Sequence, residues 1–220
     1  MESRYRQLLK AVLRACQRPL QELGMKKRTI AAYTLDLSPR RIGTVGFNSG
    51  GEHGPYVSLR VNPLMIVTDV LVDRVAQELA GVPPHKPYET STIFTPLGYL
   101  MPQQTYLEWK FSPERPIEDE VRDMTNAIKE YGLPFMRSHD DLAKIIEKMT
   151  LRQPWGWPDM IKFQLPVAFA YVGRRQEADL YVEEKLREYR KATYPAAEQF
   201  RAFAARFSIW KPEDGRDRPS

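Results

Sequence analysis

Apolar and polar residues alternate most clearly in the heptapeptide TYLEWKF, residues 105–111. Every second side chain is apolar, namely Leu107, Trp109 and Phe111. The residues between them are polar or amphipathic, namely Tyr106, Glu108 and Lys110. A period of two is typical of a β-strand with one buried face. The second face is then free for binding, for catalysis or for contact with water alone.

Four earlier segments also have strand character, and they cover residues 30–37, 41–47, 56–62 and 91–101. Short links such as Ser38-Pro39-Arg40 favour antiparallel pairing. Pro96 and Gly98 interrupt the last of these segments, which predicts an edge position or a bulge. The glycine-rich stretch NSGGEHGP, residues 48–55, is interpreted as a flexible hairpin loop and not as a phosphate-binding loop, because it lacks the required G-x-x-x-x-G-K order.

Residues 4–23 repeat apolar side chains at the spacing of an amphipathic helix, which Gly24 should end. Pro19 predicts a kink or a break near Arg18. A second helix is predicted over 66–80. Five more helices are predicted after Pro113, over residues 117–131, 138–150, 158–172, 175–192 and 195–207.

Prolines should separate these later helices, and they are Pro113, Pro134, Pro154 and Pro195. Ser138 and Asp141 are interpreted as a capping pair at the start of the second one. Pro166 falls within the third helix and predicts a kink or a later start.

The order of these segments predicts an α+β fold, with an N-terminal helix, an antiparallel five-stranded β-meander and an all-helical C-terminal half. Residues 1–112 would form the helix and the sheet, and residues 113–210 would pack on that sheet within one compact domain. The polar tail, residues 211–220, is predicted to be disordered.

Composition narrows the class of protein. The chain is 42% hydrophobic and 28% charged, which is typical of a soluble globular protein. It has no apolar run of the roughly 18 residues that a membrane helix needs, and its N-terminus lacks the apolar core of a secretory signal. A single cysteine, Cys16, excludes an intrachain disulfide and a thiolate metal cluster. We therefore expect a cytoplasmic protein that does not bind membranes.

The net charge of +5 is concentrated at the N-terminus, because residues 1–28 alone carry a net charge of +6. Four basic residues lie along one side of the first predicted helix, at Arg6, Lys10, Arg14 and Arg18. This line is either a solvated helix face or a contact surface for an acidic or phosphate-bearing partner. Nucleic acid is the least expected partner, because such binding would also need exposed aromatic residues or an inserted helix.

No catalytic constellation is present in the sequence. The G-x-S-x-G motif of serine nucleophiles is absent, and the three histidines, His53, His85 and His139, lack metal-ligand spacing. We therefore predict no catalytic residue, no metal and no cofactor. One aromatic cluster remains, QPWGWP, in which Trp155 and Trp157 either contact a partner or pack the sheet against the helical half.

Three segments carry a resemblance to a known group of proteins. They are LGMKKR at Leu23–Arg28, YVSLRVNP after the glycine-rich stretch, and AFAYVGRRQEADLYVEEKL in the helical half. Together they resemble a family of bacterial cytosolic domains of unknown function, members of which occur among immunity proteins that neutralise interbacterial toxins. The resemblance implies binding to a cognate toxin and no catalytic residues.

Three hypotheses about function follow. The first is an immunity-type protein that occludes the active site of a toxin. The second is a small-molecule-binding domain or an enzyme with a cleft between the sheet and the helices, and the third is nucleic-acid binding through the basic first helix. The candidate partner-binding residues are Tyr106, Glu108, Lys110, Arg6, Lys10, Arg14, Trp155 and Trp157.

Overall fold

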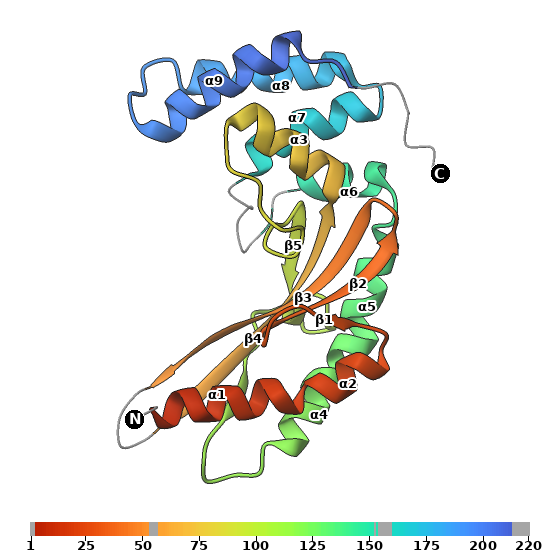
Figure 1. The fold of residues 1–220 in the computed structure, drawn as a ribbon, viewed down its shortest axis with the longest axis vertical. Coiled ribbons are helices and arrows are strands. Elements are labelled where there is room, and N and C mark those ends of the chain that lie inside the picture. The colour runs from red at the N-terminus through yellow and green to blue at the C-terminus, as the bar shows by residue number, and fades with distance from the viewer. Residues whose placement is uncertain (1–2, 53–56, 152, 154–159, 213–220) are drawn as a thin grey trace.

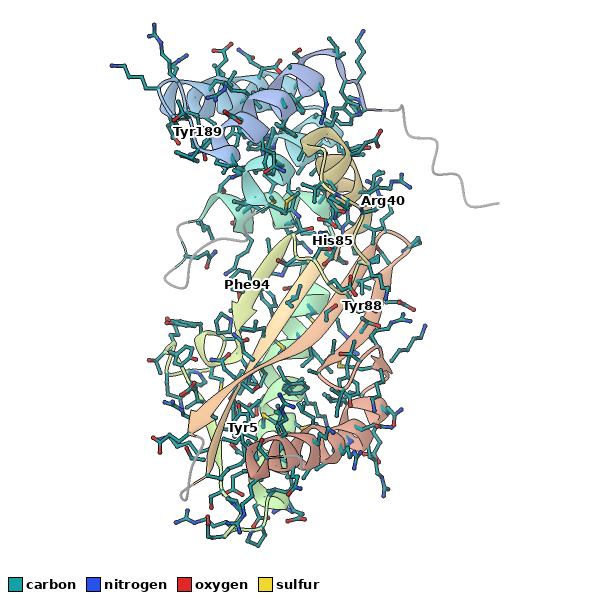
Figure 2. The ribbon with its side chains drawn as sticks, turned by 60° about the vertical axis from the view of Figure 1, so that its left-hand side comes forward. Tyr5, Arg40, His85, Tyr88, Phe94 and Tyr189 are labelled. Atoms are coloured by element: carbon teal, nitrogen blue, oxygen red, sulfur yellow. The ribbon has the colours of Figure 1, made fainter. Side chains whose placement is uncertain are left out.

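The structure is a computed structural model that describes residues 3–52, 57–151, 153 and 160–212. It confirms the α+β fold class, because an N-terminal helix precedes an antiparallel sheet, and helices follow the sheet. Figure 1 shows an elongated molecule with the sheet in the middle. Tyr5 lies at the end that carries the first helix, and Tyr189 lies in the helical cap at the other end (Figure 2).

The described part of the sheet has six strands, in the order β1-β2-β3-β4-β5, with β6 paired to β4. The strands are β1 (Lys26–Lys27), β2 (Ala32–Ser38), β3 (Arg41–Glu52), β4 (Ser58–Asp69), β5 (Ile93–Pro96) and β6 (Trp109–Phe111). All five predicted strands are present, and β1 is an addition. The strand with Pro96 ends the main path, as the proline predicted, but β6 returns to β4 instead of extending the meander beyond β5.

The long hairpin of β3 and β4 corrects one prediction. Residues 48–52 were expected in a flexible loop, but they continue β3 and pair with β4 as far as Glu52 opposite Ser58. Gly51 suits this tight pairing, because a Cβ atom there would clash with the carbonyl oxygen of Ser58. Gly51 therefore allows close strand approach here instead of forming part of a loose turn.

The strand expected over 105–111 is shorter than its pattern. Only Trp109–Phe111 pairs with β4, and residues 105–108 are irregular. Gly98 explains part of this difference, since a Cβ atom there would meet the carbonyl oxygen of Thr105 and the side chain of Leu107. Asn62 also donates its Nδ2–H to the carbonyl oxygen of Leu107 over 3.0 Å. Side-chain and turn contacts therefore hold this segment where a ladder of backbone hydrogen bonds was expected.

The first predicted helix is divided at Cys16 into α1 (Arg4–Ala15) and α2 (Gln17–Glu22). The break lies two residues before Arg18, where it was expected. Gly24 follows α2 with a positive φ of 82°, as predicted for a helix-ending glycine.

The second predicted helix starts later than its pattern suggested. It is α3 (Val70–Ala80), because residues 66–69 continue β4 and pair with β3. The carboxylate of Asp69 accepts the N–H of Val72 at 3.1 Å and so caps the helix at this later position. Gly81 ends it with a φ of 66°.

Pro134 does not separate two helices, which corrects a second boundary. The chain runs through α4 (Glu118–Ala127), a π turn η2 (Ile128–Gly132) and α5 (Leu133–Ser138) without a break. Pro134 falls in the first turn of α5, where a missing N–H is tolerated. The capping role expected of Ser138 is also wrong, because its hydroxyl donates to the carbonyl oxygen of Phe135, and Asp141 caps α6 instead.

The remaining described helices are α6 (Leu142–Thr150), α7 (Ile161–Tyr171), α8 (Arg175–Glu188) and α9 (Pro195–Ile209). Helix α7 starts later than its pattern and keeps Pro166 inside. No helix of the described residues is both long and apolar enough to cross a membrane.

The helices are arranged in two groups. Helices α1, α4 and α5 pack against the sheet, where Gly43 and Gly132 allow Met136 and Met65 to approach closely. Helices α3, α7, α8 and α9 form a cap beyond the end of the sheet (Figure 1). Phenylalanine rings fill this cap, namely Phe163, Phe200, Phe203 and Phe207.

A buried polar network joins the cap to the sheet. Asp73 in α3 is 3% exposed, and its Oδ1 accepts from Nε2 of Gln164 in α7 at 2.8 Å. Its Oδ2 accepts from Gln77 at 2.6 Å and from the hydroxyl of Thr90 at 2.8 Å. Gln164 also donates to the carbonyl oxygen of Ser91. One carboxylate thus holds α7 and the segment before β5 against α3.

Candidate partner-binding surface

The strand register gathers polar side chains on one face of the sheet near β6. Gly50, Arg60 and Lys110 lie opposite one another in β3, β4 and β6, so they belong to the same face. Lys110 is exposed, and 48% of the Arg60 side chain is exposed. The alternate residues Leu59 and Trp109 face the helices and are buried.

Two further residues extend this row. The hydroxyl of Tyr106 donates to Oε1 of Glu108 at 3.0 Å, and Oε2 of Glu108 lies 3.8 Å from Nη1 of Arg60. Burial raises the pKa of Tyr106, and the hydrogen bond with Glu108 raises it further. We call Arg60, Tyr106, Glu108 and Lys110 the polar patch. It holds a neutral tyrosine, 54% exposed, beside two cations and one anion.

The patch stands on a rigid support. Trp109 is 6% exposed, and its indole N–H donates to Oδ2 of Asp123 in α4 over 2.8 Å. Phe111 is also buried, so both neighbours of Lys110 are anchored in the core. The predicted division into one core face and one wet face is therefore confirmed for Trp109–Phe111.

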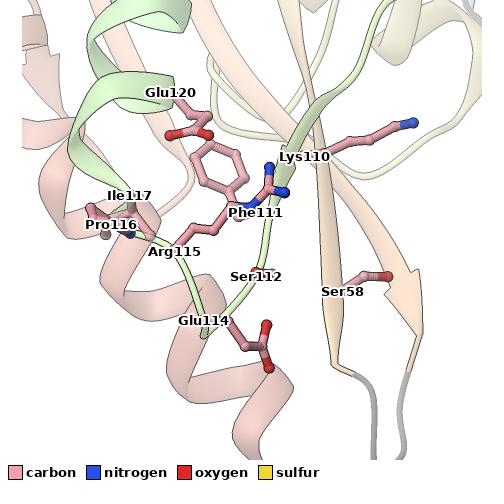
Figure 3. A pocket seen from close by; sticks show the side chains of 9 residues that line it. All are labelled: Ser58, Lys110, Phe111, Ser112, Glu114, Arg115, Pro116, Ile117 and Glu120. Atoms are coloured by element: carbon pink, nitrogen blue, oxygen red, sulfur yellow. The ribbon is translucent and has the colours of Figure 1, made fainter.

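A cavity of about 410 Å³ lies beside the patch, where β6 leads into α4 (Figure 3). It is lined by Ser58, Lys110, Phe111, Ser112, Glu114, Arg115, Pro116, Ile117 and Glu120. Figure 3 shows Lys110 directed away from Arg115 and Glu120, and Glu114 directed to the opposite side. Lys110 and Glu114 thus point away from the region beside Phe111 where the ends of Arg115 and Glu120 lie.

The structure offers no metal centre in the part of the chain that it describes. There, no group of three or more histidine, cysteine, aspartate or glutamate side chains is placed to hold an ion. The prediction that the chain uses no metal or cofactor stays a prediction.

The basic line of the first helix is divided by the break at Cys16. Arg6, Lys10 and Arg14 are exposed on α1, whereas Arg18 lies on α2 and pairs with Glu22 at 2.8 Å. The opposite side of α1 is buried through Leu8, Val12 and Leu13. Three of the four predicted cations therefore share one exposed helix surface at the end of the molecule where the hairpin also lies (Figure 1).

Cys16 and His139 lie outside this surface. Burial raises the pKa of the Cys16 thiol to about 12, which keeps it protonated and unreactive. Nδ1 of His139 lies 2.7 Å from the carbonyl oxygen of Phe135, so this nitrogen carries the proton and donates it. Burial lowers the pKa of His139. Trp155 and Trp157, the remaining candidate residues, lie outside the described residues.

Arg60 was missed in the sequence, although a signal for it was present. It stands between Leu59 and Val61 in a clean period-two pattern, which places it on the polar face of its strand. Its position opposite Lys110 could not be foreseen, because that depends on β6 pairing with β4.

Searches of protein-family models, curated proteins and solved structures find no match to this chain.

Proposed function

We propose that this chain is a cytosolic binding protein of the immunity type, which neutralises a bacterial toxin by covering the toxin's active site with the polar patch. The single observation that carries the proposal is the exposed row of Arg60 and Lys110 on paired strands, with Tyr106 in the segment just before β6, all beside the buried Trp109. Tyrosine and arginine are enriched among the residues that dominate protein interfaces. A rigid support lowers the entropy cost of presenting them.

Charge supports a particular kind of partner. The exposed cations of α1, which include Arg6, Lys10 and Arg14, add to Arg60 and Lys110 at the same end of the molecule. Complementary charge accelerates encounter and suppresses wrong partners. The proposed partner is thus a toxin with an acidic surface around its active site.

The directions of Lys110 and Glu114, which point away from the other charged groups of the neighbouring cavity, favour binding over catalysis. An enzyme would need convergent groups there, whereas an interface needs only a rim of separate side chains around buried contacts. Lys110 lines both the patch and the cavity, so one partner side chain could fill the cavity while the patch is covered.

Co-expression with the toxin encoded beside this chain tests the proposal. The wild-type protein should restore growth, and the Arg60→Ala/Lys110→Ala variant should restore it poorly. The matched control is Arg190→Ala/Lys191→Ala, which removes two exposed cations near Tyr189 at the opposite end. Failure of the wild-type protein to bind or to protect would contradict the proposed function. Equal protection by all three proteins would show that the polar patch does not contact the toxin.

A further inference from the structure

Strand β3 is longer than the strand beside it. Pairing between β2 and β3 ends where Ala32 lies opposite Gly46, but β3 remains paired with β4 up to Glu52. Residues Asn48–Glu52 thus have a strand on one side only within the described part of the sheet (Figure 1). We call these five residues the free edge.

The backbone groups of the free edge can be assigned a direction. The N–H of Phe47 donates to the carbonyl oxygen of Ala31 over 3.1 Å, so Phe47 points its backbone groups toward the β2 side. Direction alternates along a strand. The N–H and C=O groups of Ser49 therefore point outward along the free edge, while those of Asn48 and Gly50 point toward β4.

The free edge lacks the usual protection against strand addition. Exposed edges are commonly shortened or carry lysine, proline or inward-pointing charge. The terminal strand on this same side of the sheet follows that rule, because β1 consists only of Lys26 and Lys27. At the free edge Asn48, Ser49 and Gly50 are exposed and uncharged, and a Cβ atom on Gly50 would meet nothing within 4 Å. The charged residue of the five is Glu52, which is exposed at the far end of the edge.

We propose that the free edge binds an extended acidic segment of a partner protein as an additional β-strand. This inference rests on the proposed function, which it deepens by naming the segment that the partner contributes. Strand addition supplies affinity through backbone hydrogen bonds and specificity through alternate side chains. An added strand would lie next to Gly50, which shares its row with Arg60 and Lys110.

Charge decides between an acidic partner and a second copy of this chain. A symmetric pair of free edges would bring together two ends that each carry the basic helix α1, and these like charges would repel. An acidic strand would instead be attracted by α1 on one side of the sheet and by Arg60 and Lys110 on the other.

Proline substitution gives a sharp test. Ser49→Pro removes an N–H that no strand of the described sheet uses, so the hairpin should stay folded while strand addition is blocked. Ser49→Ala is the matched control, because it keeps the backbone N–H. The loss of one outward hydrogen bond and the obstruction by the ring should weaken binding by at least about tenfold.

The probe is a capped heptapeptide of alternating threonine and glutamate, compared with its threonine–lysine counterpart by NMR titration of the labelled protein. The glutamate peptide should shift the amide signals of Asn48–Glu52 and slow hydrogen exchange at Ser49. The lysine peptide should do neither. Binding should weaken as salt is raised from about 50 to about 500 mM, since the attraction is electrostatic.

Four outcomes would overturn the inference: unchanged amides in the free edge, equal binding by Ser49→Pro, equal binding of both peptides, or a wild-type dimer that Ser49→Pro dissociates. If Ser49→Pro fails to fold, hydrogen exchange in the wild-type protein still decides. Growth protection without peptide binding at the free edge would reject this inference alone. Peptide binding without growth protection would reject the immunity function alone.

Discussion

At the scale of single residues, Trp109 and Lys110 are neighbours with opposite roles. Trp109 is buried and hydrogen-bonded to Asp123, whereas Lys110 projects from the polar patch. Trp109→Ala should lower the free energy of unfolding by roughly 3–5 kcal/mol, because it removes a large ring and leaves a cavity. Urea denaturation at constant pH measures this change.

Lys110→Ala is the matched control for that experiment. It should change the free energy of unfolding by no more than about 0.5 kcal/mol, as exposed substitutions usually do, while weakening partner capture. A large loss of stability in Lys110→Ala would mean that both faces of β6 contribute to the core, and the patch could not then be separated from folding.

His139 should make stability depend on pH. Burial lowers its pKa in the folded state, and Lys148 and Lys144 act in the same direction, while the hydrogen bond with Phe135 and the nearby Glu147 oppose it. Below the ordinary histidine pKa of about 6.5 the unfolded chain therefore binds the proton more readily than the folded protein. The contribution of neutral His139 to the free energy of unfolding is present above that pH and is lost as the pH falls toward the lowered pKa.

Urea midpoints at about pH 7.5 and about pH 5.5 should therefore differ more for the wild-type protein than for His139→Gln, which cannot titrate. The same pH dependence in both proteins would show that His139 does not contribute to it.

At the scale of elements, two glycines in the sheet region have opposite environments. Gly98 in the 3-10 turn η1 (Leu97–Tyr99) faces the backbone of Thr105, while Gly50 in β3 faces open space. Gly98→Ala should lower the free energy of unfolding by about 1–3 kcal/mol through overpacking. Gly50→Ala should leave it within about 0.5 kcal/mol.

Thermal and urea denaturation of both variants check this contrast. Because Thr105 adjoins Tyr106, Gly98→Ala should also displace part of the polar patch and weaken partner binding, whereas Gly50→Ala should not disturb the patch. Equal stability of the two variants would show that the turn relaxes easily and does not hold the segment before β6.

At the scale of the whole molecule, the buried network around Asp73 connects the cap with the sheet. Asp73→Leu removes the acceptor of Gln77 and one of the two acceptors of both Gln164 and Thr90, and Gln164→Leu leaves Asp73 with one acceptor oxygen unused. Each change should destabilise by at least about 1–3 kcal/mol, the usual cost of an unsatisfied buried polar group.

The double variant tests whether the two residues act together. Its destabilisation should be smaller than the sum of the single effects by about 1 kcal/mol or more, because neither side chain then leaves the other unpaired. Strict additivity, measured by urea denaturation, would show that the cap and the sheet are held together by apolar packing instead.

Much of the fold could be predicted because its signals are local. The alternation at Trp109–Phe111, the helix-ending positions of Gly24 and Gly81, and the end position of the strand with Pro96 all follow from backbone geometry within a few residues. Period, turn residues and order together were enough for the α+β class.

Two misplaced boundaries depend on partners distant in sequence, and a third depends on a local π turn. Residues 48–52 have the composition of a loop, but they pair with β4. Residues 66–69 have a helical pattern, but they lie in β4 and pair with β3 and β5. Pro134 looks like a boundary until the π turn places it in the first turn of α5. Local propensity differs by only about 1 kcal/mol per residue, so long-range pairing and packing override it.

The candidate site likewise has a part that the sequence predicts and a part that depends on long-range pairing. The amino-acid sequence by itself determined that Tyr106, Glu108 and Lys110 are a polar set beside a buried tryptophan, although only Lys110 lies in the strand that the alternation predicted. Only the tertiary structure decided that Arg60 joins them, that Lys110 diverges from Arg115, and that β3 has a free edge. These features arise from which strands pair and where each pairing stops, and the hydrogen bonds that set those limits join residues far apart along the chain.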